Sequence, residues 1–490
     1  MVAHTLHPAG IAGWETTSRQ SGRVGAALLI SALLSGCASF SGDRGMDAVS
    51  GIVTPALKSD VVALNSDEDF AAADARVAAL LKRPLNADAA VQIALLNNRD
   101  LQADYNALGI AEAARVRASL PPSPKFDLSR LAGGGGLELE ARIIGNILLL
   151  GTLPARADVA TDRFRQAQLR AVEATLRTGF AARRAFAEAV AGRQLVGFLT
   201  QVQSSAEAAV ELSKRLGESG TMTKLDQARN KVLHAETMAR LATARQRATA
   251  SRERLVRTLG LSGHDLGFAL PASLPAVPAR AINAKQIEVE AIRRRADLQI
   301  ARLEVIALGK NYGLTKTTRI LNLLEVSGTY KRTQDAAGET TIERGLGVEF
   351  EVPLFDFGET SVREAEATYD QAVNRLSAKA VNVASEAREA YAQYRTAADV
   401  ARRYQHDVLP LRKTITEETL LRYNAMQIDV FALLVESRER IAATISAIEA
   451  QRDFWLADAN LKSAILGGGS AAEAPAKSST ATASAEPAGH

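Results

Sequence analysis

The sequence repeats one pattern twice, and this duplication restricts the possible folds more than any other feature. Three short motifs occur once in each copy: an Asp-Leu-Gln start, a polar turn and a Leu-Gly end, at 100–102 and 297–299, 217–228 and 422–433, and 259–260 and 466–467. The order of the motifs is kept, and the offsets of 197, 205 and 207 leave room for a small insertion in the second copy. Three matches in register predict a tandem duplication of one structural unit.

Long helices are predicted within each copy. None of the 14 prolines falls between Pro154 and Pro271 or between Pro410 and Pro475, and proline is the strongest helix breaker. Apolar residues recur there at alternating spacings of three and four, which is the seam of a coiled coil. At 1.5 Å per residue, a helix of roughly 60 residues would extend about 90 Å. That is far longer than an ordinary globular domain needs.

The single cysteine lies in an N-terminal export pattern. Arg19 and Arg23 precede the apolar run 24–34, which is too short to span a bilayer and has the shape of a signal peptide. The run ends in Leu-Ser-Gly-Cys, similar to the lipobox of bacterial lipoproteins, which implies a signal peptide over 1–36 and a diacylglycerol on Cys37. Ala38 then favours sorting to the outer membrane. The alternative is a buried cysteine in a short helix. Residues 1–18 are long for the start of a signal peptide, so a true translation start that lies after residue 1 also stays open.

Four segments alternate apolar and charged residues with the period of two that is typical of strands, at about 124–131, 137–150, 321–331 and 341–354. The alternation places the charged side chains on one face, which in a barrel would line the lumen: Glu138, Glu140, Glu349 and Glu351. Leu139, Val348 and Phe350 would face lipid. A sheet on a soluble core gives the same pattern, but strands of about ten residues in a lipoprotein favour a transmembrane barrel. Four strands cannot close a barrel around a pore, so the chain would have to oligomerise.

The remaining segments complete the predicted organisation of the chain. Residues 37–83 form an extended N-terminal lead-in, and the two repeats cover 84–265 and 285–468. The linker 266–284 contains three prolines, and the tail 469–490, rich in Gly, Ala, Ser and Pro, is predicted to be disordered.

Composition and motifs exclude several classes of function. The 59 basic and 55 acidic residues are nearly balanced, unlike the charge of a nucleic-acid binder. The mature chain has no apolar run near twenty residues, which excludes a helical membrane protein. The six histidines lack metal-ligand spacing, and the glycine run 133–136 lacks the Lys-Ser/Thr of a phosphate-binding loop. No catalytic constellation is present, so we expect no enzyme and no cofactor other than the lipid on Cys37.

The sequence resembles the outer-membrane efflux protein family (TolC-like) over about residues 84–468. The residues that carry the resemblance are 87–103, the turn 219–221, 294–305 and above all 347–372, where an alternating strand, a Pro-Leu-Phe-Asp corner and a long helix follow one another. The resemblance implies a mainly α chain with a membrane β-barrel part. Three copies would build a twelve-stranded outer-membrane barrel on a hollow periplasmic cylinder of helices, closed at its tip and opened by an adaptor.

The chain departs from the family pattern in three places. An apolar run, 147–154, stands where the second copy has the Pro-Leu-Phe-Asp corner. The first strand pair is joined by little more than 132–136, and Ala425 stands where the family usually has glycine.

The resemblance implies a passive exit duct of a tripartite efflux or type I secretion system. Its partners would be two further copies, a periplasmic adaptor, an inner-membrane pump and outer-membrane lipid, with no nucleic acid. The alternative is a periplasmic adaptor lipoprotein, but adaptors carry one set of hairpins, whereas two occur here in tandem. The substrate stays open. The ending 454–461 is faintly similar to members associated with metal-ion efflux.

Two aspartates, Asp226 and Asp429, are the candidate gate residues. They lie in the two turns where the long helices reverse, and threefold symmetry would bring their copies toward one axis. A ring of like charges attracts cations and resists complete closure unless a base such as Lys224 or Arg422 neutralises it. The alternative is that both carboxylates only cap exposed helix ends, and the sequence does not choose between the two.

Overall fold

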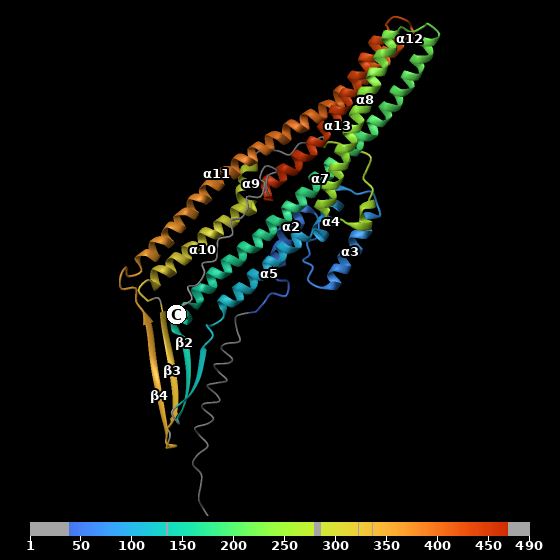
Figure 1. Ribbon diagram of the computed structural model, residues 1–490. Coiled ribbons are helices and arrows are strands. Elements are labelled where there is room, and N and C mark those ends of the chain that lie inside the picture. Colours follow the sequence, from blue (N-terminus) through green and yellow to red (C-terminus); the bar gives the residue numbers. More distant parts are fainter. Residues whose placement is uncertain (1–38, 134–135, 279–285, 322, 336, 469–490) are drawn as a thin grey trace, which may run out of the picture. The chain divides into compact units, whose positions relative to one another are not determined.

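The computed structural model describes residues 39–133, 136–278, 286–321, 323–335 and 337–468 (Figure 1). The predicted signal peptide, Cys37 and the predicted tail lie outside the described residues. The described chain divides into two compact units. We call them the strand unit (39–41, 113–160 and 323–350) and the helical unit (42–112, 161–322 and 351–468).

A single antiparallel sheet forms the strand unit. Its strands are β1 (Lys125–Gly133), β2 (Gly136–Asn146), β3 (Leu323–Gln334) and β4 (Thr340–Glu351), in the spatial order β1-β2-β3-β4. β2 pairs with β1 on one side and with β3 on the other, with Ile143 opposite Phe126 and Gly328. The first and the second strand pair, one from each repeat, therefore meet in one sheet.

The predicted second strand, 137–150, is too long at its end. The strand stops at Asn146, and the apolar run that follows forms a short helix, α6 (Ile147–Gly151). The Asn146 side chain accepts a hydrogen bond from the Leu149 backbone N–H at 2.8 Å, which is a helix N-cap. The capping Asn146 thus starts a helix at a point where the apolar residues alone would allow the strand to continue. β4 likewise ends at Glu351, three residues before the predicted end.

Helices make up the helical unit, and two of them, α5 and α7, continue in sequence into the strand unit. Their bounds are α2 (Met46–Leu57), α3 (Asp67–Leu81), α4 (Ala87–Asn97), α5 (Arg99–Ser119), α7 (Leu153–Glu218), α8 (Lys224–Leu259), α9 (Ile287–Arg294), α10 (Ala296–Thr318), α11 (Glu359–Arg403), α12 (Leu409–Asn424) and α13 (Val430–Leu466). A 3₁₀ turn follows α8 at Gly263–Gly267, and a π-helix, Tyr404–Val408, joins α11 to α12. The 66 residues of α7 span roughly 100 Å at 1.5 Å per residue.

The N-terminal lead-in is not extended, which corrects the prediction for 37–83. It forms α2 and α3, and Val49, Val53 and Leu57 of α2 are completely buried in the core. Gly179 of α7 allows this packing, because a Cβ there would lie only 2.4 Å from the Leu57 side chain. Burial of three aliphatic side chains stabilises the attachment by about 1.5–3 kcal/mol each, as an upper estimate.

The repeated Leu-Gly ends have a structural cause. Gly260 follows the last residue of α8 with φ 70°, the left-handed conformation that ends many helices. A side chain there would also collide with the neighbouring helix, because a Cβ would lie 2.6 Å from the Asn97 carbonyl oxygen. Gly467 ends α13 with φ 101°. In both copies a long helix therefore stops where only glycine fits.

An ionic cluster around the buried Arg295 joins α9 and α10 to α11. The Arg295 side chain, 7% exposed, donates to Asp297 at 3.0 Å and to Glu386. Lys379 lies 3.4 Å from the second oxygen of Asp297. Burial alone would lower the pKa of Arg295, but the two carboxylates outweigh it and raise the pKa. The Asp-Leu-Gln motif of the second copy thus fixes a charge pair inside the unit.

Candidate functional site

The sheet has one mainly polar face and one mainly apolar face. Cross-strand register places Glu138, Glu140 and Arg142 on the same face as Lys331 and Glu325. Glu138 and Lys331 form an ion pair at 2.7 Å, and Glu140 and Arg142 form one at 3.1 Å. A row of alternating charges therefore crosses β2 and β3.

The opposite face is mainly apolar and open, although Arg130 and Arg332 lie on it on either side of Leu139. Phe126 and Leu128 of β1 are 76% and 73% exposed, and Ile143, their neighbour on β2, is 46% exposed. In β4, Leu346 is 91% exposed, with Val348 and Phe350 also exposed. A soluble sheet would cover such side chains with a core.

The two glutamates near the end of β4, Glu349 and Glu351, lie on the polar side by alternation. A Cβ on Gly347 would lie 2.6 Å from the Ser327 hydroxyl, and Ser327 belongs to the polar face. Glu349 and Glu351 follow Gly347 at the period of two. The placement of the four glutamates in a lumen stays a prediction, because the sheet by itself encloses no lumen.

The first tip lies between α7 and α8, and its turn depends on one glycine. Gly220 has φ 74°, and the Thr221 N–H donates to the Leu216 carbonyl at 2.9 Å, closing the end of α7. Thr223 caps α8 by accepting from the Asp226 N–H at 3.2 Å, and its hydroxyl donates to the Asp226 carboxylate at 2.7 Å. Asp226 therefore belongs to a reciprocal cap.

Asp226 is neutralised by a base that the sequence did not single out. Arg229, one turn further along α8, donates to its carboxylate at 3.2 Å. The same guanidinium lies 4.6 Å from the centre of the Phe431 ring on α13. Arg229 thus connects Asp226 to the second hairpin. It is the base that pairs with Asp226, whereas the sequence suggested Lys224 or Arg422 for that pairing.

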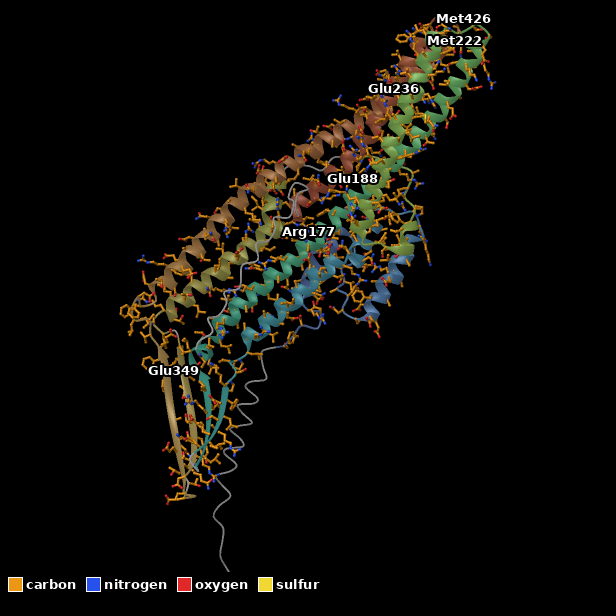
Figure 2. All side chains as sticks on the ribbon, in the orientation of Figure 1. Arg177, Glu188, Met222, Glu236, Glu349 and Met426 are labelled. Carbon is orange, nitrogen blue, oxygen red and sulfur yellow. The ribbon has the colours of Figure 1, made fainter. Side chains whose placement is uncertain are left out.

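The second tip, between α12 and α13, uses the same turn with different residues. Met426 takes the left-handed conformation with φ 57°, and the Gln427 N–H donates to the Arg422 carbonyl at 2.9 Å. Asp429 caps α13 by accepting from the Ala432 N–H at 2.9 Å. Met222 and Met426 mark the two tips at the same end of the helical unit (Figure 2).

The two tips align with an offset of 206 residues, not the 205 expected from the sequence. Gly220 corresponds to Met426 rather than to Ala425, and the capping Thr223 corresponds to Asp429. Asp226 and Asp429 are therefore not equivalent positions, since one pairs with Arg229 and the other is the N-cap itself. Both lie at helix starts, as the capping alternative expected, and their part in a gate stays a prediction.

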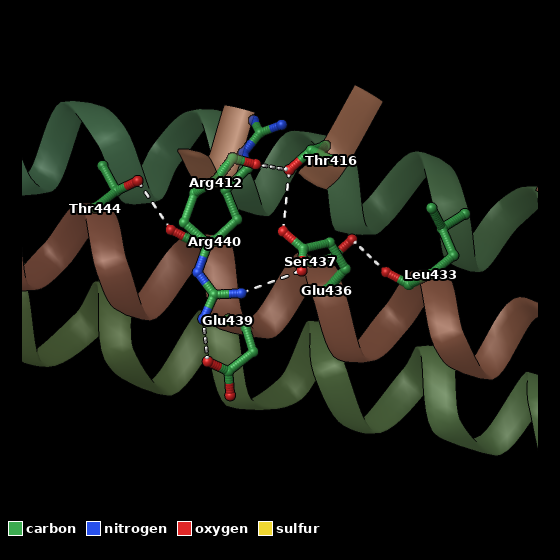
Figure 3. A network of polar contacts seen from close by, with 8 residues as sticks. All are labelled: Arg412, Thr416, Leu433, Glu436, Ser437, Glu439, Arg440 and Thr444. Carbon is green, nitrogen blue, oxygen red and sulfur yellow. Dashed lines mark hydrogen bonds and ion pairs between the residues drawn. The ribbon is translucent and has the colours of Figure 1, made fainter. Parts of the chain in front are cut away.

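A polar network below the second tip escaped the sequence reasoning (Figure 3). Glu436 of α13 is 8% exposed and accepts from Arg412 at 3.2 Å and from Thr416 at 3.1 Å, both on α12. Arg412 also donates to Glu439 at 2.8 Å. The run Glu-Ser-Arg-Glu-Arg at 436–440 reads as a solvated charged face, and only the packing of α12 shows that one glutamate points inward.

No described helix combines the length and the hydropathy needed to cross a membrane. Among the described residues, no group of three or more His, Cys, Asp or Glu side chains is arranged to hold a metal ion.

Comparison with known proteins finds one family model that matches part of the chain and several solved structures with a similar fold. Residues 289–425 match the family model of the outer membrane efflux proteins. The solved structure of the outer membrane protein VceC from Vibrio cholerae is similar, with a TM-score of 0.65 and 16% identity over 78% of this chain and 96% of that chain. No curated relative matches the chain.

Two further solved structures share the fold. CusC, described for its transmembrane channel formation, has a TM-score of 0.65 and 15% identity, over 78% of this chain and 92% of that chain. The open state of the MtrE outer membrane channel from Neisseria gonorrhoeae has a TM-score of 0.61 and 14% identity, over 77% and 88%.

These findings confirm the predicted resemblance to the TolC-like outer membrane efflux proteins. The fold class is confirmed as a mostly helical chain with a small antiparallel sheet.

Proposed function

We propose that this chain is the passive outer-membrane exit duct of a tripartite efflux or type I secretion system and that it works as a homotrimer. The sheet supports this most strongly, because it combines an open apolar face, a polar face and two outer strands, β1 and β4, that each have one partner among the described strands. Unpaired backbone groups are costly in hydrocarbon. Three copies would pair these edges and close a twelve-stranded barrel with the glutamates inside.

The partners follow from this role. A duct performs no reaction, so an inner-membrane pump would supply the energy and a periplasmic adaptor would connect the pump to the helical hairpins. The outer membrane would hold the barrel, and a lipid on Cys37 would add an anchor. Changing Cys37 to Ser should abolish incorporation of radiolabelled palmitate and leave unprocessed precursor. Equal labelling of the mutant and the parent would refute the anchor but not the duct.

Two neighbouring isoleucines provide a matched test of the barrel. Ile143 lies on the apolar face opposite Phe126, whereas Ile144 lies on the polar face opposite Lys125 and Ser327. Arginine on the lipid face costs about 2–4 kcal/mol near the bilayer midplane and much less in a lumen. We expect Ile143→Arg to abolish trimers in outer-membrane fractions and Ile144→Arg to retain them with altered conductance. Equal loss in both variants would argue for a soluble sheet.

We also propose that the two tips form the periplasmic gate. The contact of Arg229 with both Asp226 and Phe431 supports this, since it ties the first hairpin to the second near the reversal points. The test is single-channel conductance in a planar bilayer for Asp226→Ala, Asp429→Ala and the double variant. Unchanged conductance and cation selectivity in all three would exclude the aspartates as gate residues and leave the duct intact.

A further inference from the structure

Three arginines lie on the mainly apolar face of the sheet, and neither the duct nor its gate uses them. They are Arg130 on β1, Arg332 on β3 and Arg344 on β4. We propose that they form a binding site for the phosphate groups of a diphosphorylated glycolipid of the lipid A type, in the outer leaflet of the membrane. The proposal rests on the proposed function, because it requires this face of the sheet to contact lipid.

The strand register fixes the side on which two of the arginines lie. Arg130 and Arg332 are both paired with Leu139, one from each side, so the three residues share one face of the sheet. Neighbouring strands are about 4.8 Å apart. The backbones of the two arginines are therefore separated by roughly 10 Å, two strand spacings, with an apolar side chain between them.

Arg344 of β4 lies on the same face. A Cβ on Gly347 would lie 2.6 Å from the Ser327 hydroxyl of the polar face, so Gly347 belongs to the polar face. Arg344 precedes Gly347 by three residues, and an odd number of steps along a strand leads to the opposite face. The three cations thus come from three of the four strands.

The charges of the sheet are divided unevenly between its faces. Every aspartate and glutamate of the four strands lies on the polar face, where Lys331 and Arg142 each pair with a glutamate. The three arginines on the other face are exposed, and none of them forms an ion pair or a side-chain hydrogen bond with another of the described residues. Uncompensated cations on a mainly apolar surface are complementary to an anion that carries apolar groups, which is the composition of an anionic lipid.

The arginines lie in the half of the sheet that contains the hairpin turns. β1 joins β2 after Gly133, and β3 joins β4 after Gln334, and the register places both turns at the same end of the sheet. The other end of each strand continues in sequence toward a helix. If the helices are periplasmic, as the proposed function requires, the arginines belong to the outer leaflet.

Along each strand the cations follow the aromatic side chains in the direction of the turns. A strand tilted by about 40° rises roughly 2.5 Å per residue along the membrane normal. Arg130 therefore stands about 10 Å above Phe126, and Arg344 about 15 Å above Phe350. A long arginine side chain can extend its charge from such a level to the headgroups while its stem stays among apolar groups.

The spacing of the cations favours two phosphates on one lipid. A guanidinium binds a phosphate through two parallel N–H donors. A lipid that carries a phosphate on each of two linked sugars can occupy Arg130 and Arg332 together, while its acyl chains lie on Leu139 and on the apolar residues below. A phospholipid with one phosphate can occupy only one of the two cations at a time.

Tryptophan fluorescence can identify the lipid beside the arginines. Trp455 is the only tryptophan after the predicted signal peptide, so the parent protein supplies the baseline emission. Tyr330→Trp adds a reporter on the arginine face, because Tyr330 is paired with Ala141 and Ala141 with Leu128. The full-length protein is reconstituted in vesicles of brominated phosphatidylcholine, which quenches the reporter. Unbrominated lipids are then added, and the recovered emission gives the association constant of each lipid relative to phosphatidylcholine.

We expect diphosphorylated lipid A to bind about fivefold more tightly than its monophosphorylated form, the factor that corresponds to about 1 kcal/mol for one cation near an anionic surface. Arg130→Gln and Arg332→Gln should each abolish this difference, because one cation of the pair remains. Arg332→Lys keeps the charge and should retain the difference. Arg344→Gln should weaken both forms equally, and Arg142→Gln, on the polar face, is the matched control.

The other outcomes separate the site from the duct. Equal constants for phosphatidylglycerol, cardiolipin and diphosphorylated lipid A would overturn the glycolipid site in favour of a general attraction to anionic lipids. Quenching without preference for any anionic lipid would overturn the site and leave the duct standing. Absence of quenching at 330 would overturn the site and the barrel together. If a glutamine variant forms no trimers, the comparison of the two forms of lipid A on the parent protein still decides, and equal binding of both would overturn the site.

Discussion

The two tip hairpins have the same turn but different interiors. The buried polar position on the returning helix is Asn230 in the first hairpin and Glu436 in the second, 206 residues later, which is the offset of the turns. Asn230 donates to the Ser213 hydroxyl at 2.7 Å, a neutral pair. Glu436 carries a charge that Arg412 and Thr416 must compensate. Equivalent positions of the two hairpins thus carry an amide in one and a charged carboxylate in an ion pair in the other.

The ascending helices differ as well. α7 runs without interruption to Glu218, whereas a π-helix at Tyr404–Val408 separates α11 from α12. Pro410 explains the interruption, because proline has no N–H and its ring clashes with the carbonyl four residues earlier. The wider π turn, in which the Leu409 N–H reaches the Tyr404 carbonyl, accommodates it. The second hairpin therefore combines a less regular helix with a charged interior.

The largest difference between the hairpins should appear when the ion pair is broken. Arg412→Ala leaves the Glu436 carboxylate buried with only Thr416, which should cost about 3 kcal/mol, at the low end for a buried pair because Arg412 is partly exposed. Hydrogen exchange of α12 and α13 amides measures this local opening. Adding Glu436→Gln should recover most of the loss, because it removes the uncompensated charge. If Arg412→Ala lowers local stability no more than loss of the neutral Asn230–Ser213 pair does, the ion pair does not distinguish the two hairpins.

The neutral pair of the first hairpin should be less sensitive. Ser213→Ala removes one partner of Asn230, whose amide still donates to the Asp226 carbonyl at 3.2 Å. We expect a loss of about 1 kcal/mol, the usual net contribution of one hydrogen bond. Exchange of the α8 amides near Asn230 gives the value, and Ser219→Ala, at the exposed tip, is the control. A loss as large as that of Arg412→Ala would show that charge is not what distinguishes the hairpins.

Much of the fold could be predicted because it depends on patterns that the sequence repeats. The long helices follow from missing prolines and coiled-coil spacing, and the strands follow from alternation of apolar and charged residues. The ends were harder to place. Asn146 stops β2 through one side-chain hydrogen bond, and no periodicity announces a single cap.

The tip residues could be found only in part. Asp226 and Asp429 were singled out because they lie in the turns, but the base at Asp226 is Arg229, which depends on helix geometry and on Phe431 of another hairpin. Glu436 was missed, since a charge run gives no sign of which member faces inward. The sheet edges of β1 and β4 pose the same difficulty, because their outer sides have no partner among the described strands.

The tip conformations provide a third and smaller test. Met426 has φ 57° where the first tip has Gly220 with φ 74°. Met426→Gly should relieve the left-handed conformation and, after the added freedom of the unfolded chain, stabilise the tip by about 0.5–1 kcal/mol. Gly220→Ala should destabilise the first tip by a similar amount. Protection of the Gln427 and Thr221 amides against exchange reports both, and a destabilising Met426→Gly would mean that the exposed methionine has contacts of its own.

The smallest expected effect concerns the cap that distinguishes the second tip. Asparagine caps a helix about as well as aspartate, so Asp429→Asn should keep the hydrogen bond from the Ala432 N–H. The free energy of unfolding should change by only a few tenths of a kcal/mol, mainly because the negative charge at the helix N-terminus is lost. Asp226→Asn is the matched variant, and it should cost more, because it also weakens the pair with Arg229. Hydrogen exchange of the amides at the starts of α8 and α13 measures the change in local stability. Conductance in a planar bilayer measures the effect of the charge on ion flow. If Asp429→Asn leaves stability unchanged but lowers cation selectivity, Asp429 acts through its charge and not only as a cap. If both quantities stay unchanged while Asp226→Asn alters conductance, the gate depends on the first tip, where a carboxylate, an arginine and an aromatic ring join the two hairpins.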